Sequence, residues 1–203
     1  EENRPRVLEK AKSKKLESDK LLDQAKKKIT ENEKKLKGLK ENFNKVKDSV
    51  DELFALDIQN KSDKEIKGLW ANLYRQQKEY FSNDDKLKKF SSMLDKSKKN
   101  FKKLKETNDY KIILNIISGI ERANSKKRLN DFETQLTSVN VIDVGPLNEI
   151  LDETTDEINS FEKEIDEIDE LRERIIELDE KVGTGFNFIT IGLYFLGFLL
   201  VIG

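Results

Sequence analysis

The stretch LKGLKENFNKVKDSVDEL, residues 36–53, decides the fold of this chain of 203 residues. Its apolar side chains are separated by alternating steps of three and four residues. They are Leu36, Leu39, Phe43, Val46, Val50 and Leu53. A repeat of 3.5 residues places them in one stripe along a helix and is typical of a coiled-coil seam. The stretch therefore predicts a long helix that packs along its length against other helices.

The same stepping extends outward on the N-terminal side as far as Leu8. Alternating steps of three and four residues give fifteen positions from Leu8 to Asp57, and eleven of these residues are apolar. We expect the first helix to run from about Pro5, which a first helical turn tolerates, to about Leu56. Asn32 falls inside this seam. It either fixes the register of the pairing at a cost in stability or marks a defect where the packing frays.

Towards the C-terminus, residues 57–63 (DIQNKSD) collect turn-forming residues, with Ser62 or Asp63 as the cap of the next helix. The apolar repeat restarts at Ile66, and its phase continues across residues 82–85 (SNDD). We therefore expect a continuous or merely kinked helix at residues 82–85. Trp70 lies beside the seam and is expected to pack in a core.

Residues 109–136 form a third helical segment, whose isoleucines at 112, 113, 116, 117 and 120 make an apolar face too broad for a two-stranded seam. This width predicts a position in the middle of a bundle. Residues 138–146 (SVNVIDVGP) read as an extended connector, because Gly-Pro breaks a helix. A last seam follows between residues 147 and 182 and includes Ile158, Phe161, Ile165, Ile168, Leu171, Ile175 and Leu178.

The final eighteen residues, FNFITIGLYFLGFLLVIG at 186–203, contain no charge. As a helix they would measure about 27 Å, close to the hydrocarbon thickness of a bilayer. They predict a single-pass transmembrane anchor, with Gly183-Thr184-Gly185 as a joint before it. Alternatives are a buried core helix or a segment that inserts only when triggered. The expected membrane residues are Phe186, Ile189, Ile191, Leu193, Phe195, Leu196, Phe198, Leu199, Leu200, Val201 and Ile202.

The predicted fold is therefore all-α, an elongated coiled-coil or helical-bundle body with a C-terminal transmembrane helix. We expect a basic helical bundle or hairpin region at residues 1–137, a connector at 138–146, an acidic coiled-coil stalk at 147–182 and the anchor at 186–203. Charge follows this division closely. Residues 1–130 carry 35 Lys and Arg against 22 Asp and Glu, a net of +13, whereas residues 131–203 carry 4 against 18, a net of −14.

Catalytic chemistry is not expected. The chain has no His and no Cys, which removes the commonest general base, the thiol nucleophile and the main ligands of transition metals. No Gly-rich phosphate loop is present. The acidic run from Glu162 to Glu170 radiates its carboxylates around a helix and so reads as a solvated face, not a calcium loop. We therefore expect no enzyme, no cofactor, no metal and no small-molecule substrate.

The lysine clusters of the first 130 residues allow several interpretations. Arg and stacking aromatics, which specific nucleic-acid binding favours, are scarce among them, so nucleic acid is not the expected partner. The clusters could form a solvated outer face, could attract an anionic membrane surface, or could dock on an acidic partner. The nearest acidic partner is the stalk of the same chain.

The sequence predicts a membrane-anchored coiled-coil scaffold or tether that acts through helix–helix interactions between proteins. Its expected partners are membrane lipid, other proteins that bind through the coiled coil, and further copies of the chain. The body is expected on the cytoplasmic side, because Lys181 is the only basic residue close to the anchor. The layout of helical region, heptad segment and terminal apolar run is similar to that of SNARE proteins, and this resemblance implies membrane fusion or remodelling. Thr154 stands where that family carries Gln or Arg. A helical pore former is the remaining alternative.

Overall fold

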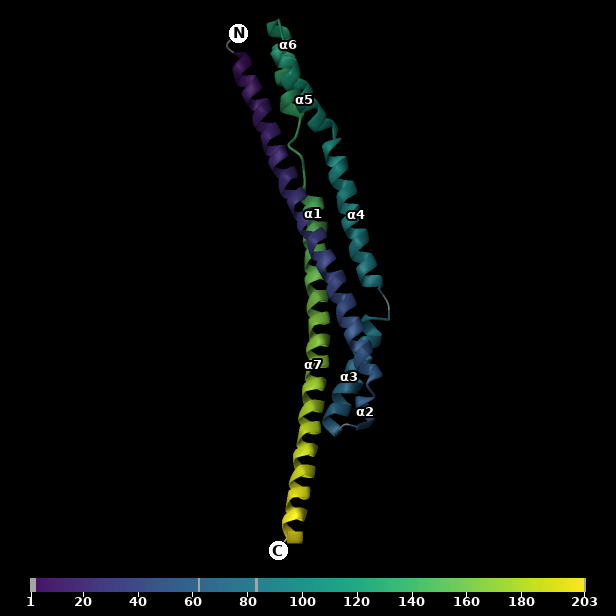
Figure 1. The fold of residues 1–203 in the computed structure, drawn as a ribbon. Coiled ribbons are helices and arrows are strands. Elements are labelled where there is room, and N and C mark those ends of the chain that lie inside the picture. Colours follow the sequence, from purple (N-terminus) through teal and green to yellow (C-terminus); the bar gives the residue numbers. More distant parts are fainter. Residues whose placement is uncertain (1–2, 62, 83, 203) are drawn as a thin grey trace. The chain divides into compact units, whose positions relative to one another are not determined.

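The computed structural model describes residues 3–61, 63–82 and 84–202, with side chains described as far as Gly183. Figure 1 shows helices joined by short connections, and the described residues contain no strand. The helices are α1 (Asn3–Ala55), α2 (Ile58–Lys61), α3 (Lys64–Tyr80), α4 (Asp85–Lys105), α5 (Asn108–Glu121), α6 (Lys126–Ser138) and α7 (Gly145–Ile202). The prediction of an all-α fold is confirmed.

The predicted transmembrane helix has no counterpart among the described residues. Among the described residues, no helix is long and apolar enough to cross a bilayer. The physical reason is that the apolar residues of the described helices occupy narrow stripes, while charged residues fill the remaining faces. The side chains of 186–203, on which the anchor prediction rests, lie outside the described part of the chain. The break expected at residues 183–185 is absent, because α7 continues as a helix from Gly145 to Ile202.

The helices form two compact units. Unit 1 comprises Glu1–Lys37 and Lys88–Ile158, and unit 2 comprises Gly38–Leu87 and Asn159–Gly203. Both α1 and α7 contribute to each unit, because the boundary falls within these two long helices. Each unit is described below by its own contacts.

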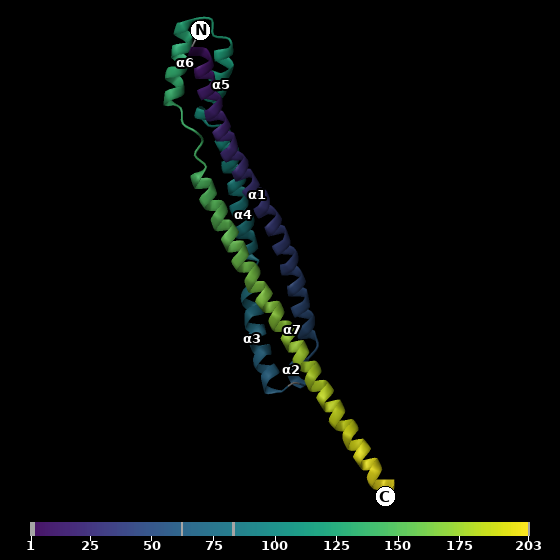
Figure 2. The same ribbon diagram turned by 90° about the vertical axis from the view of Figure 1, so that its left-hand side faces the viewer.

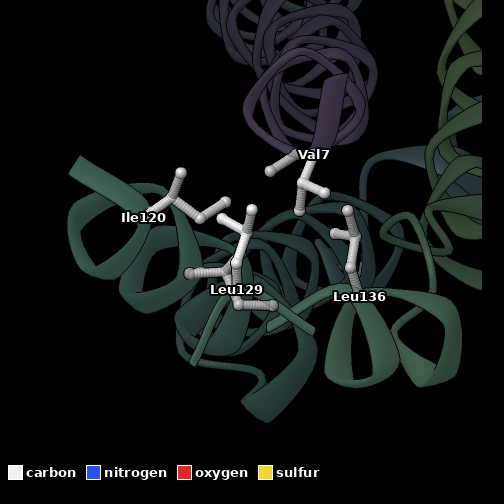
Figure 3. Packing of buried hydrophobic residues seen from close by; sticks show 6 residues of the cluster. Val7, Ile120, Leu129 and Leu136 are labelled. Atoms are coloured by element: carbon white, nitrogen blue, oxygen red, sulfur yellow. The ribbon is translucent and has the colours of Figure 1, made fainter. Parts of the chain in front are cut away.

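One core of unit 1 lies between the N-terminal part of α1 and the pair α5–α6, which lie beside it in both views (Figure 1, Figure 2). Figure 3 shows Val7 of α1 directed towards Ile120 of α5 and towards Leu129 and Leu136 of α6. All four side chains are buried. Burying a branched aliphatic side chain contributes about 1.5–3 kcal/mol, so this cluster holds the hairpin of α5 and α6 against α1.

The third predicted segment is two helices and not one. Residues 122–125 interrupt it, and the Ser125 hydroxyl accepts a hydrogen bond from the Arg128 backbone N–H at 3.3 Å, capping α6. At the other end of α6, Lys14 Nζ donates to the carbonyl oxygens of Leu136 (2.8 Å) and Val139 (2.6 Å). A cation at a helix C-terminus is favourable because the last carbonyls have no partner within the helix.

The connector between α6 and α7 is extended, and its apolar side chains point inward. Ile142 and Val144 are buried in a second cluster of unit 1 together with Leu22 of α1. The backbone N–H of Ile142 donates to the buried Ser18 hydroxyl at 3.3 Å. This bond satisfies a backbone donor that would otherwise be buried without a partner. Pro146 then falls in the first turn of α7, where a missing N–H costs nothing.

In unit 2, the start of α3 follows the sequence prediction. Asp63 is its N-cap, and the carboxylate accepts from the Ile66 backbone N–H at 3.0 Å. The prediction of a continuous helix across residues 82–85 is wrong, since α3 ends at Tyr80 and α4 begins at Asp85. The reason is that Phe81 is buried and packs edge-on against Phe43, with ring centroids 5.1 Å apart. Burial of this ring outweighs the continuity of the heptad pattern.

Candidate protein-interaction surfaces

The residues predicted as an interaction seam are mostly buried within the single chain. Those of α1 are all buried, and Leu39 and Val50 are completely covered. In α7, Leu171 and Leu178 are half-buried, whereas the other five predicted residues are buried: Ile158, Phe161, Ile165, Ile168 and Ile175. Side chains already covered inside one chain are not available to a second chain unless the unit opens. Their use as a seam between chains stays a prediction.

Asn32 is a polar contact inside the apolar seam of unit 1. Its side chain is 1% exposed. The amide Nδ2 donates to the Leu151 carbonyl oxygen at 3.0 Å, and Oδ1 accepts from the Thr155 hydroxyl at 2.7 Å. Both amide ends are therefore satisfied by α7. A buried amide without such partners would lose about 1–3 kcal/mol of desolvation energy, so this contact favours one register of α1 against α7.

Two further buried polar side chains, Thr154 and Ser97, bond within their own helices. Thr154 donates to the Ile150 carbonyl oxygen at 2.6 Å, and Ser97 donates to the Met93 carbonyl oxygen at 2.9 Å. Thr154 stands where SNARE proteins carry Gln or Arg. Its hydroxyl is used up inside α7 and is not directed across a helix interface.

Ion pairs join basic helices to the acidic α7 within each unit. In unit 1, Lys28 Nζ lies 2.8 Å from Asp152 Oδ1 and Lys89 Nζ 2.8 Å from Glu157 Oε2. In unit 2, Lys86 Nζ lies 2.9 Å from Glu164 Oε2. All these side chains are about a third or more exposed, and exposed pairs contribute about 0–1 kcal/mol each. They orient α7 more than they stabilise the fold.

The acidic run of α7 is partly engaged in these contacts and does not form a metal site. Glu164 binds Lys86, Asp166 accepts from the Asn42 amide at 2.9 Å, and Asp169 pairs with Arg172 at 2.8 Å. No group of three or more His, Cys, Asp or Glu side chains converges on a metal-sized site in the part of the chain that the structure describes. These three carboxylates contact separate neighbours.

Aromatic rings fill the core of unit 2. Phe43 of α1 packs on Phe161 of α7, with centroids 6.1 Å apart, and Lys86 Nζ lies 4.8 Å above the Phe161 ring. The pKa of Tyr80 is raised, first by burial and then by the charge of Glu164. Trp70 packs on Phe54 at 4.9 Å and is buried, so its predicted role as a core residue is confirmed.

A polar network that the sequence did not reveal joins α5 to α1 in unit 1. The Tyr110 hydroxyl donates to Asp19 Oδ1 at 2.6 Å, and Lys15 Nζ lies 2.6 Å from Asp19 Oδ2. Burial raises the pKa of Asp19, but the hydrogen bonds from Lys15 and Tyr110 outweigh it and the net shift is downward. The hydrogen bond to Asp19, followed by burial, raises the pKa of Tyr110 to about 12.

Unit 1 contains open cavities, two of which lie beside α6. The larger, of about 330 Å³, is lined by Arg4, Asn124, Ser125 and Lys126 among others. The second, of about 290 Å³, lies between α1 and α6 beside Lys14 and Leu136. Arg4 is already engaged with the Ala123 carbonyl oxygen.

Comparison with known proteins gives two similarities. The chain is 30% identical over 125 residues to the protein GrpE of Borreliella burgdorferi, covering 60% of this chain and 65% of that protein. It is 29% identical over 146 residues to the protein GrpE of Borrelia hermsii, covering 70% of this chain and 78% of that protein. The chain thus spans somewhat less than two thirds of the length of the first relative. No family model matches the chain, and no solved structure shows significant similarity to it.

These findings correct the function predicted from the sequence. Similarity to GrpE proteins, together with the lack of a bilayer-spanning helix among the described residues, contradicts a membrane-anchored scaffold or tether. The same two findings contradict the SNARE-like fusion protein, the pore former, the membrane-lipid partner and the location in a membrane.

Proposed function

We propose that this chain is a non-catalytic helical factor that acts by binding another protein, as a GrpE-like cochaperone of a DnaK-type chaperone. The similarity to two GrpE proteins over 60% and 70% of the chain carries this proposal. In this role the chain promotes nucleotide release from its partner by favouring one conformation of it. A binding protein can shift such an equilibrium only through its different affinities for the two conformations.

The composition of the chain and the structure support a binding role. The chain lacks His and Cys, and the buried polar side chains of the seams, such as Asn32 and Thr154, are engaged in hydrogen bonds between or within helices. Long helices with satisfied seams form a stiff surface, which a protein that acts on the conformation of a partner requires. The absence of the commonest catalytic side chains leaves contact with the partner as the means of action.

The test measures nucleotide release from a purified DnaK-type chaperone loaded with a fluorescent ADP analogue. The full chain is added in a stopped-flow instrument with excess unlabelled nucleotide. We expect the release rate to rise with the concentration of the chain and to saturate, because the chain binds the chaperone at a specific site. The chain alone should not hydrolyse ATP.

Two variants test whether faster nucleotide release requires the folded chain or is a general effect of charged helices. Leu39→Asp places a carboxylate in a completely buried site of unit 2, whereas Lys40→Asp changes an exposed neighbour. Leu39→Asp should abolish the acceleration, and Lys40→Asp should retain most of it. An unchanged release rate at saturating concentrations of the unaltered chain would refute the proposed function.

A further inference from the structure

The outer face of α4 in unit 1 is a dense lysine surface. Residues 96–103, KSKKNFKK, contain five lysines and no acidic residue. Lys96, Lys99 and Lys103 are spaced at i, i+3 and i+7, so they lie on one face of the helix, with Lys102 beside them. These four residues, all exposed, are here called the lysine face. The buried residues of α4, such as Phe90, Leu94 and Ser97, lie on the opposite side.

Neighbouring lysines of α4 pair with carboxylates of other helices. Lys89 pairs with Glu157 at 2.8 Å, and Lys98 pairs with Glu33 of α1. The Glu33 hydrogen bond raises the pKa of Lys98. Among the described residues, none makes an ion pair or side-chain hydrogen bond with the four lysines of the lysine face. Lys89 and Lys98 therefore pair with carboxylates of other helices, whereas the four lysines of the lysine face make no such pair among the described residues.

Like charges lie at helical spacing within the lysine face, and Asp95 lies four residues before Lys99. Lys96 and Lys99 are three residues apart, and Lys99 and Lys103 are four apart, and like charges at these spacings destabilise a helix. Lys102 and Lys103 lie in the last turn of α4, where they interact favourably with the helix dipole. Lys96 and Lys99 lie before that turn and gain nothing from it. A carboxylate-bearing surface placed against this face would remove the repulsion.

We propose that the lysine face is a docking surface for an acidic helix of a partner protein. Charge complementarity is the basis, and the chain itself shows the geometry, because lysines of the same helix already bind glutamates of α1 and α7. The face has neither Arg nor an exposed aromatic ring, which binding to single-stranded nucleic acid favours. Lysine side chains are long and flexible, so they adapt to carboxylates spaced along a helix. This inference does not depend on the identity of the chaperone proposed above.

The test uses fluorescein-labelled poly-L-glutamate as the acidic probe and measures its fluorescence anisotropy with the full chain. Binding is compared at about 50 mM and about 300 mM salt, because screening weakens contacts between exposed charges. The variant Lys96→Gln/Lys99→Gln/Lys103→Gln removes three charges from the lysine face. The control variant Lys12→Gln/Lys20→Gln/Lys26→Gln removes three exposed charges from α1 in the same unit. Net charge is thus the same in both variants.

We expect the lysine-face variant to bind poly-L-glutamate about tenfold more weakly at low salt, and the control variant to lose less than about twofold. The melting temperature of the lysine-face variant should stay the same or rise, since like-charge repulsion is removed. Equal weakening in the two variants would show a general charge effect and would overturn the proposal. Loss of helicity in the lysine-face variant would overturn it too. The proposal would also be overturned if the lysine-face variant bound single-stranded DNA or phosphatidylserine vesicles more weakly but bound poly-L-glutamate as well as the unaltered chain does.

Discussion

The contact between Gly119 of α5 and Phe132 of α6 allows a sharp prediction, because glycine in a helix is normally a weakness. A Cβ atom at Gly119 would meet the far end of the Phe132 ring, at 2.9 Å from Cε1 and 3.1 Å from Cε2, with Cζ closer still. Real Cβ atoms do not approach carbon atoms so closely. Phe132 also packs against the buried cluster that holds α5 and α6 to α1. Gly119→Ala therefore displaces a core side chain.

Two opposing effects set the magnitude for Gly119→Ala. Alanine favours the helix over glycine by about 1 kcal/mol, whereas overpacking a core costs about 1–3 kcal/mol. We expect a net destabilisation of about 1 kcal/mol, or a fall of about 2–4 °C in melting temperature for a chain of this size. Gly38 and Gly68 provide matched controls, because nothing lies within 4 Å of a Cβ built at either position. Gly38→Ala and Gly68→Ala should each stabilise the chain by about 0.5–1 kcal/mol.

The assay is urea unfolding followed by circular dichroism, with Gly119→Ala measured in the unaltered chain and again in a Phe132→Ala background. If the ring is the obstacle, Gly119→Ala should become stabilising once the ring is removed, and the double-mutant cycle should show a coupling of about 1–2 kcal/mol. The reasoning is refuted if Gly119→Ala stabilises the unaltered chain as much as Gly38→Ala does.

Two further predictions concern the polar contacts of unit 1. Asn32→Ala should lower the free energy of unfolding by about 1–2 kcal/mol, because it removes two hydrogen bonds between α1 and α7 from a buried site. Asn42→Ala should lower it by less than about 0.5 kcal/mol, since Asn42 bonds an exposed carboxylate of α7; similar losses in the two variants on urea unfolding would argue against a register contact. The raised pKa of Tyr110, about 12 against 10.0 unfolded, stabilises the fold below pH 10, and this contribution should be lost as the pH rises from 10 to 12. Tyr110→Phe should remove that part of the alkaline loss, and curves of equal slope for both proteins between pH 10 and 12 would contradict the assignment.

Local patterns were sufficient for the course of α1 and for the start of α3. The 3.5-residue repeat from Leu8 to Leu53 predicted the greater part of α1, and the turn formers before Ile66 predicted the N-cap at Asp63. Both depend on residues close together in the sequence, so the information is present there. The proposed chaperone-binding role could not be predicted in this way, because the proposal rests on similarity to two GrpE proteins over 125 and 146 residues and on no single motif.

The candidate surfaces were predictable only in part. The lysine clusters were visible in the sequence, but only the structure separated lysines that bind carboxylates, such as Lys89 and Lys98, from those of the lysine face. The Tyr110–Asp19 hydrogen bond joins residues 91 positions apart, and no local signal marks either residue. The prediction of a membrane anchor rested on the segment 186–203, whose side chains lie outside the described residues.

The sequence by itself determined that this chain is helical, where its first helix runs and that it lacks the commonest catalytic side chains. These properties follow from short-range periodicity and from composition. Tertiary structure decided where helices end against the pattern, as at Phe81, and what the seams cover, as at Asn32 and Leu39. The physical reason is that a stripe of apolar residues along a helix predicts only that this face is buried. Which partner buries it depends on chain connections and on packing between residues more than a hundred positions apart.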